Sequence, residues 1–356
     1  MTPAMRRVLE LVALAVVPLA ALVIGLATFA DQDRLALDFH EEVYPQADAI
    51  VDGRDPYPDP AAAITDTTNA IWPIAAVLPA VPFTGVSPAA ADWIATFVVL
   101  ACLVGALWLL DVRDWRIYGV TLLWPSVIDA YQTANVTLPL MLLLAIVWRY
   151  RDRRAFAGVA LGGALALKFF LWPVVLWLVA TGRRGAAVIS TAIAVASLAL
   201  LVPWIGILDY VRLLRKLGAT FDGLSYTPYA LLVDLGAPSS VARAVTILLG
   251  ASLIALAWRR RSLGLAMAAA LCVSPIVWRH FFALLAVPLA ISRPRFDLVW
   301  LVPLGMWVGA GTLNGDTWQT AVVLSVAAAT FLLAEIGPPS RAGAGELPSV
   351  PIRAEG

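Results

Sequence analysis

Charged residues are scarce in this 356-residue chain, where Asp, Glu, Lys and Arg make up 14% of the sequence and apolar residues 61%. The mean hydropathy is +0.84. Such a composition excludes an ordinary soluble domain and predicts an all-α polytopic membrane protein whose surroundings are a lipid bilayer. The net charge is only +1 and no basic stripe with interleaved aromatic residues occurs, so we expect no nucleic-acid partner.

Cysteine is almost absent as well. Cys102 and Cys272 both lie inside apolar runs, where a thiol behaves as a small apolar group. The sequence also lacks a Cys-x-x-Cys pair, a His-Glu metal motif, a glycine-rich nucleotide loop and a Walker lysine. We therefore expect no cofactor and no metal site. If the protein is a transferase, the lack of a nucleotide site implies that its donor is carried by a lipid.

Arginine clusters predict the topology, because Lys and Arg in short loops mark the cytoplasmic side and a span needs about 20 apolar residues. Placing every cluster inside puts both termini in the cytoplasm. The predicted spans are 8–30, 88–110, 117–130, 134–148, 185–204, 240–258, 262–278, 281–292, 296–312 and 318–335. With two broken elements added, we expect a bundle of about 10–12 transmembrane or re-entrant helices.

Two segments do not fit full crossings. Basic clusters flank 155–182 on both sides, and 28 residues are too few for two crossings at 1.5 Å per residue, so a re-entrant helical hairpin with its bend near Lys168 to Pro173 is predicted. The segment 71–83 is short and broken by prolines, which places it at the outer surface or dipping in beside the loop. Broken helices at membrane depth have to be buried in protein or line a wet cavity.

The chain is predicted to form one domain over 1–336, with long extracytoplasmic loops at 31–87 and 206–240. Long ordered loops tend to be functional. The segment 337–356 is rich in Pro, Gly and Ala and is expected to be a disordered cytoplasmic tail.

The first loop is strongly acidic, since Asp31 to Asn69 holds ten acidic residues against two arginines. Apolar residues after Asp38 recur at near-helical spacing, which predicts a short amphipathic helix on the membrane surface. At the start of that helix Asp38 either caps it or acts as a general base at the membrane boundary.

Cations near membrane depth are further candidates. Lys168 lies in the apolar stretch GVALGGALALKFFLWP, where a charge costs about 2.5 to 3.5 kcal/mol and indicates a functional site; a lysine that extends to the interface is the alternative. Arg279 and His280 form a charged break between two predicted spans. Either they make a tight interfacial turn, or they bind a phosphate group.

Polar residues at the predicted outer face could contact a sugar. Gln132 and Asn135 stand near the end of a predicted span, where a surface turn is the simpler alternative. Tyr57 belongs to the turn sequence GRDPY, in which Gly and Pro dictate the backbone whatever the tyrosine does.

The ordered set of motifs resembles the bacterial polyprenol-phosphate-mannose-dependent α-mannosyltransferases of glycosyltransferase family 87, in the GT-C superfamily. The similar stretches are Asp38 to Tyr57, YQTANVTLPLMLLLA, AGVALGGALALKFFLWP, SYTPYALL and SPIVWRHFFALLAVP. The sequence departs from the family pattern at Tyr131, at the spacing of Gln132 and Asn135, at Pro173 and at Phe281.

The resemblance implies a polyprenyl-phosphate-sugar donor, a glycan or glycolipid acceptor and inverting transfer at the extracytoplasmic face of a bacterial plasma membrane. Asp38 matches the family's essential carboxylate. Position and charge make Lys168, Arg279 and His280 candidates for the donor phosphate. Tyr57, Gln132, Asn135 and Tyr226 lie in the similar stretches and are candidates for substrate contacts.

Our leading hypothesis is therefore a hexosyltransferase, in the first place a mannosyltransferase of cell-envelope glycolipid biosynthesis, with Asp38 as base. A transporter of a lipid-linked or small polar substrate would also contain many helices and an intramembrane lysine, but no inverted repeat of the acidic loop or of the Lys168 segment is found. A scaffolding membrane protein is the third hypothesis.

Overall fold

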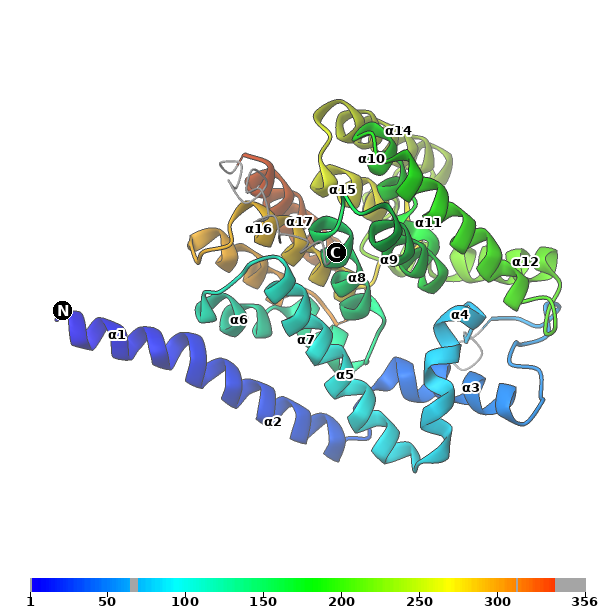
Figure 1. Ribbon diagram of the computed structural model, residues 1–356, viewed down its shortest axis with the longest axis horizontal. Coiled ribbons are helices and arrows are strands. Elements are labelled where there is room, and N and C mark those ends of the chain that lie inside the picture. The colour runs from blue at the N-terminus through cyan, green and yellow to red at the C-terminus, as the bar shows by residue number, and fades with distance from the viewer. Residues whose placement is uncertain (1, 65–69, 312, 337–356) are drawn as a thin grey trace, which may run out of the picture.

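The structure, a computed structural model, describes residues 2–64, 70–311 and 313–336, and within these ranges it is helical with no strand (Figure 1). The α-helices are α1 (Pro3–Leu11), α2 (Val17–Asp31), α3 (Tyr44–Val51), α4 (Ile74–Val77), α5 (Pro88–Leu109), α6 (Trp115–Leu122), α7 (Pro125–Gln132), α8 (Thr137–Arg149), α9 (Arg154–Leu167), α10 (Pro173–Ala180), α11 (Arg184–Ser197), α12 (Ile207–Phe221), α13 (Pro228–Asp234), α14 (Ser239–Arg260), α15 (Leu263–Val273), α16 (Ala286–Ser292) and α17 (Thr317–Ile336).

Shorter turns of π or 3₁₀ geometry join these helices. They are η1 (Val12–Val16), η2 (Phe39–Val43), η3 (Leu78–Gly85), η4 (Phe169–Leu171), η5 (Leu198–Leu200), η6 (Asp222–Leu224), η7 (Arg279–Leu285) and η8 (Leu298–Val308). The predicted tail 337–356 lies outside the described residues.

Five helices of the described chain are long and apolar enough to cross a membrane, which identifies a multi-pass membrane protein. They are Pro3–Asp31, Pro88–Leu109, Arg184–Leu201, Ser239–Arg260 and Thr317–Ile336. All five coincide with predicted spans. The first is a continuous helix at the edge of the molecule (Figure 1). It packs closely on α6 because Gly119 has no side chain: a Cβ there would lie only 1.7 Å from the carbonyl oxygen of Leu14.

The other predicted spans are not formed by single long helices. The segments 117–130 and 134–148 contain α6, α7 and α8, and α7 and α8 meet at 113°, so this pair is a broken span or a re-entrant loop. No single helix within 262–278, 281–292 or 296–312 is long enough to count as a candidate span. α15, η7 and α16 are almost wholly buried in protein, and a helix buried on all sides is as apolar as one facing lipid.

The segment 155–182 forms two short helical arms that meet at Lys168, as predicted. α9 packs in parallel on α11: a Cβ on Gly158 would lie 2.7 Å from Cβ of Ile189, and one on Gly162 2.7 Å from Cβ of Ile193. The same spacing of 31 residues places Lys168 level with Ala199, next to the end of the span Arg184–Leu201. This register predicts that Lys168 lies near one end of the candidate span and not at its middle.

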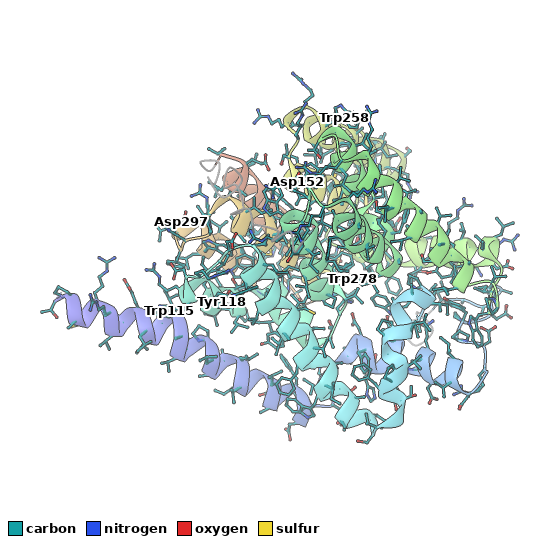
Figure 2. All side chains as sticks on the ribbon, viewed as in Figure 1. Trp115, Tyr118, Asp152, Trp258, Trp278 and Asp297 are labelled. Carbon is teal, nitrogen blue, oxygen red and sulfur yellow. The ribbon has the colours of Figure 1, made fainter. Side chains whose placement is uncertain are left out.

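The predicted cytoplasmic loops meet at one end of the bundle, marked in Figure 2 by Trp115, Asp152, Trp258 and Asp297. The ion pairs and hydrogen bonds that join them are Glu10 with Arg116, Asp111 with Arg149, Asp152 with Arg183, Asp114 with the backbone of Phe296, Trp177 with the carbonyl of Arg261, and Arg293 with the carbonyl of Leu333. We call this the basic end.

The long loops meet at the opposite end, which we call the loop end; α3, α4 and α12 lie there at the right of Figure 1. Tyr210 of α12 donates a hydrogen bond to the carbonyl of Ile71, and Lys216 donates to the carbonyls of Pro60 and Ala62. The segment 71–83 is not a span, as predicted: α4 and η3 pack against the predicted amphipathic helix, which is observed as η2 and α3.

Candidate functional site

Asp38 lies at the loop end, directly before η2. Its carboxylate makes no capping hydrogen bond to that helix, so the capping interpretation is wrong. Its Oδ2 instead accepts a 2.6 Å hydrogen bond from Nδ2 of Asn135. The backbone N–H of Phe39 also donates to the carbonyl of Thr133 at 3.2 Å, so two bonds attach the first loop to the α7–α8 junction.

Asn135 is itself held in place. Its Oδ1 accepts hydrogen bonds from the backbone N–H of Thr137 at 3.1 Å and from the Thr137 hydroxyl at 2.9 Å. Because the amide oxygen is engaged on one side, the amide nitrogen is directed at Asp38. The sharp bend between α7 and α8, with Ala134 in the left-handed region at φ 47°, turns Asn135 away from both helix axes and towards the first loop. A buried amide whose oxygen is held by Thr137 thus orients the carboxylate.

Glu42 provides a second carboxylate one helical turn after Asp38. Residues four apart lie on the same face of a helix, and Glu42 is partly buried. Its Oε2 accepts a hydrogen bond of 2.5 Å from the indole nitrogen of Trp72. The hydroxyl of Tyr57 in turn donates to the backbone carbonyl of Trp72 at 2.9 Å, so that the indole is fixed from behind.

Lys168 extends its ammonium group between two aromatic rings. Nζ lies 4.6 Å from the ring centroid of Trp72 and 4.0 Å from that of Phe281. Within the described ranges it makes no direct ion pair, although its charge interacts with Asp38 and Glu42. Cation–π contacts stabilise a desolvated ammonium by up to about 2 kcal/mol. The result is a cation with two apolar walls and no anion bound directly to it.

The two carboxyl groups differ in proton affinity. Burial raises the pKa of Asp38 to about 6, although the Asn135 hydrogen bond and the Lys168 charge act to lower it. Burial, followed by the negative charge of Asp38, raises the pKa of Glu42 to about 8. Glu42 therefore holds its proton to higher pH than Asp38, which favours the charge state of a base beside a hydrogen-bond donor.

Arg279, predicted to bind the donor phosphate, is engaged elsewhere. Its Nε and Nη2 donate to the two carboxylate oxygens of Asp129 at 2.7 and 2.8 Å, and Nη1 donates to the carbonyl of Gly309 at 3.0 Å. Both side chains are buried. This bidentate pair joins α7 to η7 and leaves Arg279 with little charge to offer a ligand.

His280 is 1% exposed and close enough to Lys168 for the lysine charge to act on it. Neither ring nitrogen has a hydrogen-bond partner among the described residues. Its ring centroid is 4.8 Å from that of Phe281, the residue whose ring contacts Lys168. The charge of Lys168 acts on both Asp38 and His280. A neutral imidazole with two unpartnered nitrogens can donate one hydrogen bond and accept another.

The two tyrosines predicted to contact substrate are buried and make contacts within the protein. Tyr57 is 7% exposed and packs edge-on against Tyr210 at 5.5 Å. Tyr226 is 1% exposed, and its hydroxyl accepts from the backbone N–H of Ala310. Gln132 is buried close to Asn135. Of the four, Asn135 alone is bonded to Asp38 in the structure.

Sequence reasoning had not assigned the roles of Glu42, Trp72 and Asp129. The i, i+4 spacing of Asp38 and Glu42 was a visible signal for a paired site. Nothing in the sequence pointed to Trp72 as the link between Glu42 and Lys168, or to Asp129 as the partner of Arg279, because these contacts bring together distant segments.

In the described part of the chain, no three His, Cys, Asp or Glu side chains gather in a way that could hold a metal ion. Comparisons of this chain with protein-family models, curated proteins and solved structures give no match.

Proposed function

We propose that this protein is a membrane glycosyltransferase of the GT-C type. It moves a hexosyl group, in the first place mannosyl, from a polyprenyl-phosphate-sugar donor to a glycan or glycolipid acceptor, with inversion at the anomeric carbon. The observation that carries the proposal is the placement of Lys168, a cation without a direct ion pair in the described chain, close to the oriented carboxylate of Asp38.

In the proposed reaction an acceptor hydroxyl attacks the anomeric carbon of the donor. Asp38 takes the hydroxyl proton as the new C–O bond forms. The bond between the anomeric carbon and the phosphate oxygen breaks, and the bonding pair leaves with the polyprenyl phosphate. The ammonium of Lys168 stabilises the charge that develops on this phosphate, and its aromatic walls keep the local dielectric low, so that the stabilisation is strong.

The position of the cluster favours a lipid-linked donor. Lys168 lies level with the end of a membrane span, which is the depth of a lipid phosphate. A polyprenyl chain in the bilayer could therefore present its headgroup to Lys168 from the side, while a hydrophilic acceptor reaches Asp38 from the water.

The orientation follows from charge. The basic end is the cytoplasmic side by the rule that Lys and Arg in short loops stay inside. The loop end, with Asp38, is then extracytoplasmic, which for a bacterial cell is the outer face of the plasma membrane.

The test is transfer of labelled mannose from polyprenyl-phosphate-mannose by the purified protein in proteoliposomes, with bacterial membrane glycolipids as acceptor. Asp38→Asn should reduce transfer by about 10² to 10⁴-fold, as removal of a general base does. Asp48→Asn is the matched control, because Asp48 is an exposed acid of the same loop.

Equal rates in Asp38→Asn and wild type would remove Asp38 from the mechanism. Movement of intact labelled donor across the bilayer, without transfer of its sugar, would contradict the proposal and favour the transporter hypothesis.

A further inference from the structure

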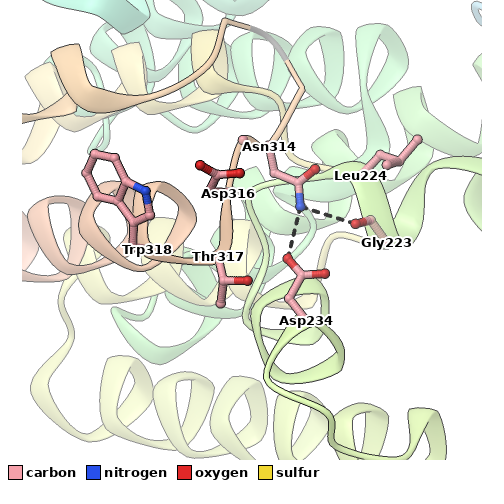
Figure 3. A pocket seen from close by; sticks show the side chains of 8 residues that line it. Gly223, Leu224, Asp234, Asn314, Asp316, Thr317 and Trp318 are labelled. Carbon is pink, nitrogen blue, oxygen red and sulfur yellow. Dashed lines mark hydrogen bonds between the residues drawn. The ribbon is translucent and has the colours of Figure 1, made fainter.

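A shallow, wide-open cavity of about 610 Å³ lies at the loop end between η6, α13 and the start of α17 (Figure 3). It shares no lining residue with the cluster around Asp38. Its walls are formed by Gly223, Leu224, Asp234, Asn314, Gly315, Asp316, Thr317 and Trp318. The volume falls in the range of small-molecule sites, roughly 300 to 1,000 Å³.

The lining combines an aromatic plane with hydrogen-bonding groups. The indole of Trp318 is 56% exposed, and Figure 3 shows it on one side of the cavity, with Asp316 and Thr317 between it and Asn314. Asp234 and Asp316 accept hydrogen bonds, Thr317 can donate or accept, and the amide oxygen of Asn314 can accept. An aromatic face beside carboxylates and an amide is the chemistry that binds a neutral sugar ring.

The walls are already fixed by bonds within the protein. Nδ2 of Asn314 donates to the carbonyl of Gly223 at 3.2 Å and to Asp234 at 3.3 Å, and its backbone N–H donates to the carbonyl of Leu224 at 3.1 Å. Gln319 holds the other side, accepting from the N–H of Asp316 at 2.9 Å. A preformed cavity loses less entropy when it binds a ligand.

Other ligand classes fit less well. Two carboxylates and no cation in the lining disfavour an anion, which excludes the phosphate of a lipid-linked donor. A metal ion alone would leave most of a cavity of about 610 Å³ empty. No group of three His, Cys, Asp or Glu side chains suited to a metal occurs in the described chain.

We propose that this cavity binds neutral sugar residues of a glycan, with Trp318 stacking on a ring and Asp316, Asp234 and Asn314 bonding its hydroxyls. The assignment of this glycan as the acceptor rests on the proposed function, whereas sugar binding itself does not. Two hydrogen bonds join the segments next to the two sites: the backbone N–H of Tyr226 donates to the carbonyl of Val277 at 2.8 Å, and Nη1 of Arg279 donates to the carbonyl of Gly309.

Sugar binding can be measured by calorimetry with mannotriose and the full-length protein in lipid nanodiscs. We expect Trp318→Ala and Asp316→Asn each to weaken binding at least tenfold. Trp258→Ala is the matched control, an exposed tryptophan at the basic end, and should bind like wild type. Thermal unfolding of each variant identifies any that misfolds. If Trp318→Ala misfolds, the binding measurement on Asp316→Asn tests the proposal.

Absence of mannotriose binding, or equal binding by folded Trp318→Ala, Asp316→Asn and wild type, would overturn the proposal. So would calcium binding that depends on Asp234 and Asp316 in place of sugar binding. Failure here is distinguishable from failure of the transferase proposal: Asp38→Asn should still bind mannotriose while losing transfer, and Trp318-dependent binding would stand even if no transfer occurred.

Discussion

Asn135 and Asp38 are separated by 97 positions in the sequence and joined by a 2.6 Å hydrogen bond. The bond connects the acidic first loop to the bend between α7 and α8. Through it, a carboxylate of a surface loop acquires a fixed direction from the buried part of the bundle.

Loss of the Asn135 amide should change the pH dependence of transfer. The bond lowers the pKa of Asp38, so Asn135→Ala should raise that pKa. A hydrogen bond to a charged group contributes about 1.5 to 3 kcal/mol, which corresponds to about one to two pH units. The acidic limb of the rate profile should move upward by that amount while activity at high pH is partly retained. An unmoved limb would contradict the role of Asn135.

The wild-type rate should pass through a maximum between two transitions. Asp38 must be ionised to accept a proton, so the rate rises as pH increases through about 6. Glu42 loses its proton as pH passes about 8, and the added negative charge beside Lys168 weakens binding of an anionic donor, so the rate falls. Transfer measured from pH 5 to 9.5 checks both limbs.

Glu42→Gln should abolish the alkaline limb and leave the acidic one in place, because glutamine keeps a hydrogen-bond acceptor for Trp72 and cannot ionise. Glu41→Gln is the matched control, since Glu41 is the exposed neighbouring acid. A limb that persists in Glu42→Gln would assign the second transition to another group.

Removal of the Lys168 charge should separate function from stability. Lys168→Met keeps the length of the side chain and removes a desolvated cation, so the thermal midpoint should be unchanged or higher. Transfer should fall at least 100-fold through weaker stabilisation of the departing phosphate. Retained transfer, or parallel loss of transfer and of folded protein, would point to a purely structural lysine.

The contact between α9 and α11 should tolerate no side chain at Gly162. A Cβ there would lie 2.7 Å from that of Ile193, whereas nothing lies within 4 Å of a Cβ on Gly163. Overpacking costs about 1 to 3 kcal/mol, so Gly162→Ala should lower the thermal midpoint in detergent. Gly163→Ala should leave it unchanged or raise it, as alanine favours a helix. Equal midpoints would contradict the packing.

The Asp129–Arg279 pair should be structural. Breaking a buried pair costs about 3 to 5 kcal/mol, whereas replacing both partners with apolar residues is often neutral. Arg279→Met and Asp129→Leu should each reduce the yield of folded protein, and the double variant should recover it. Transfer by the double variant decides the role: recovered activity makes Arg279 structural, and a folded but inactive protein makes it a donor ligand.

The sequence by itself determined the membrane class and the five long spans. It also singled out Asp38 and Lys168 as charged residues with a candidate functional role. These features depend on local composition and on the cost of placing charge in an apolar segment, which can be read along the chain. For the same reason it did not foresee that α15 and α16 are short and buried: their runs are as apolar as a lipid-facing helix, and composition does not distinguish burial in protein from burial in lipid.

Only the tertiary structure decided how these charges are paired. It bound Arg279 to Asp129, a pairing 150 positions apart, and left Lys168 between two rings without a direct ion pair in the described chain. It also placed Trp72 against Glu42 and Asn135 against Asp38. Such contacts depend on helix packing and on the bend at Ala134, which bring distant segments together, and no local pattern encodes them.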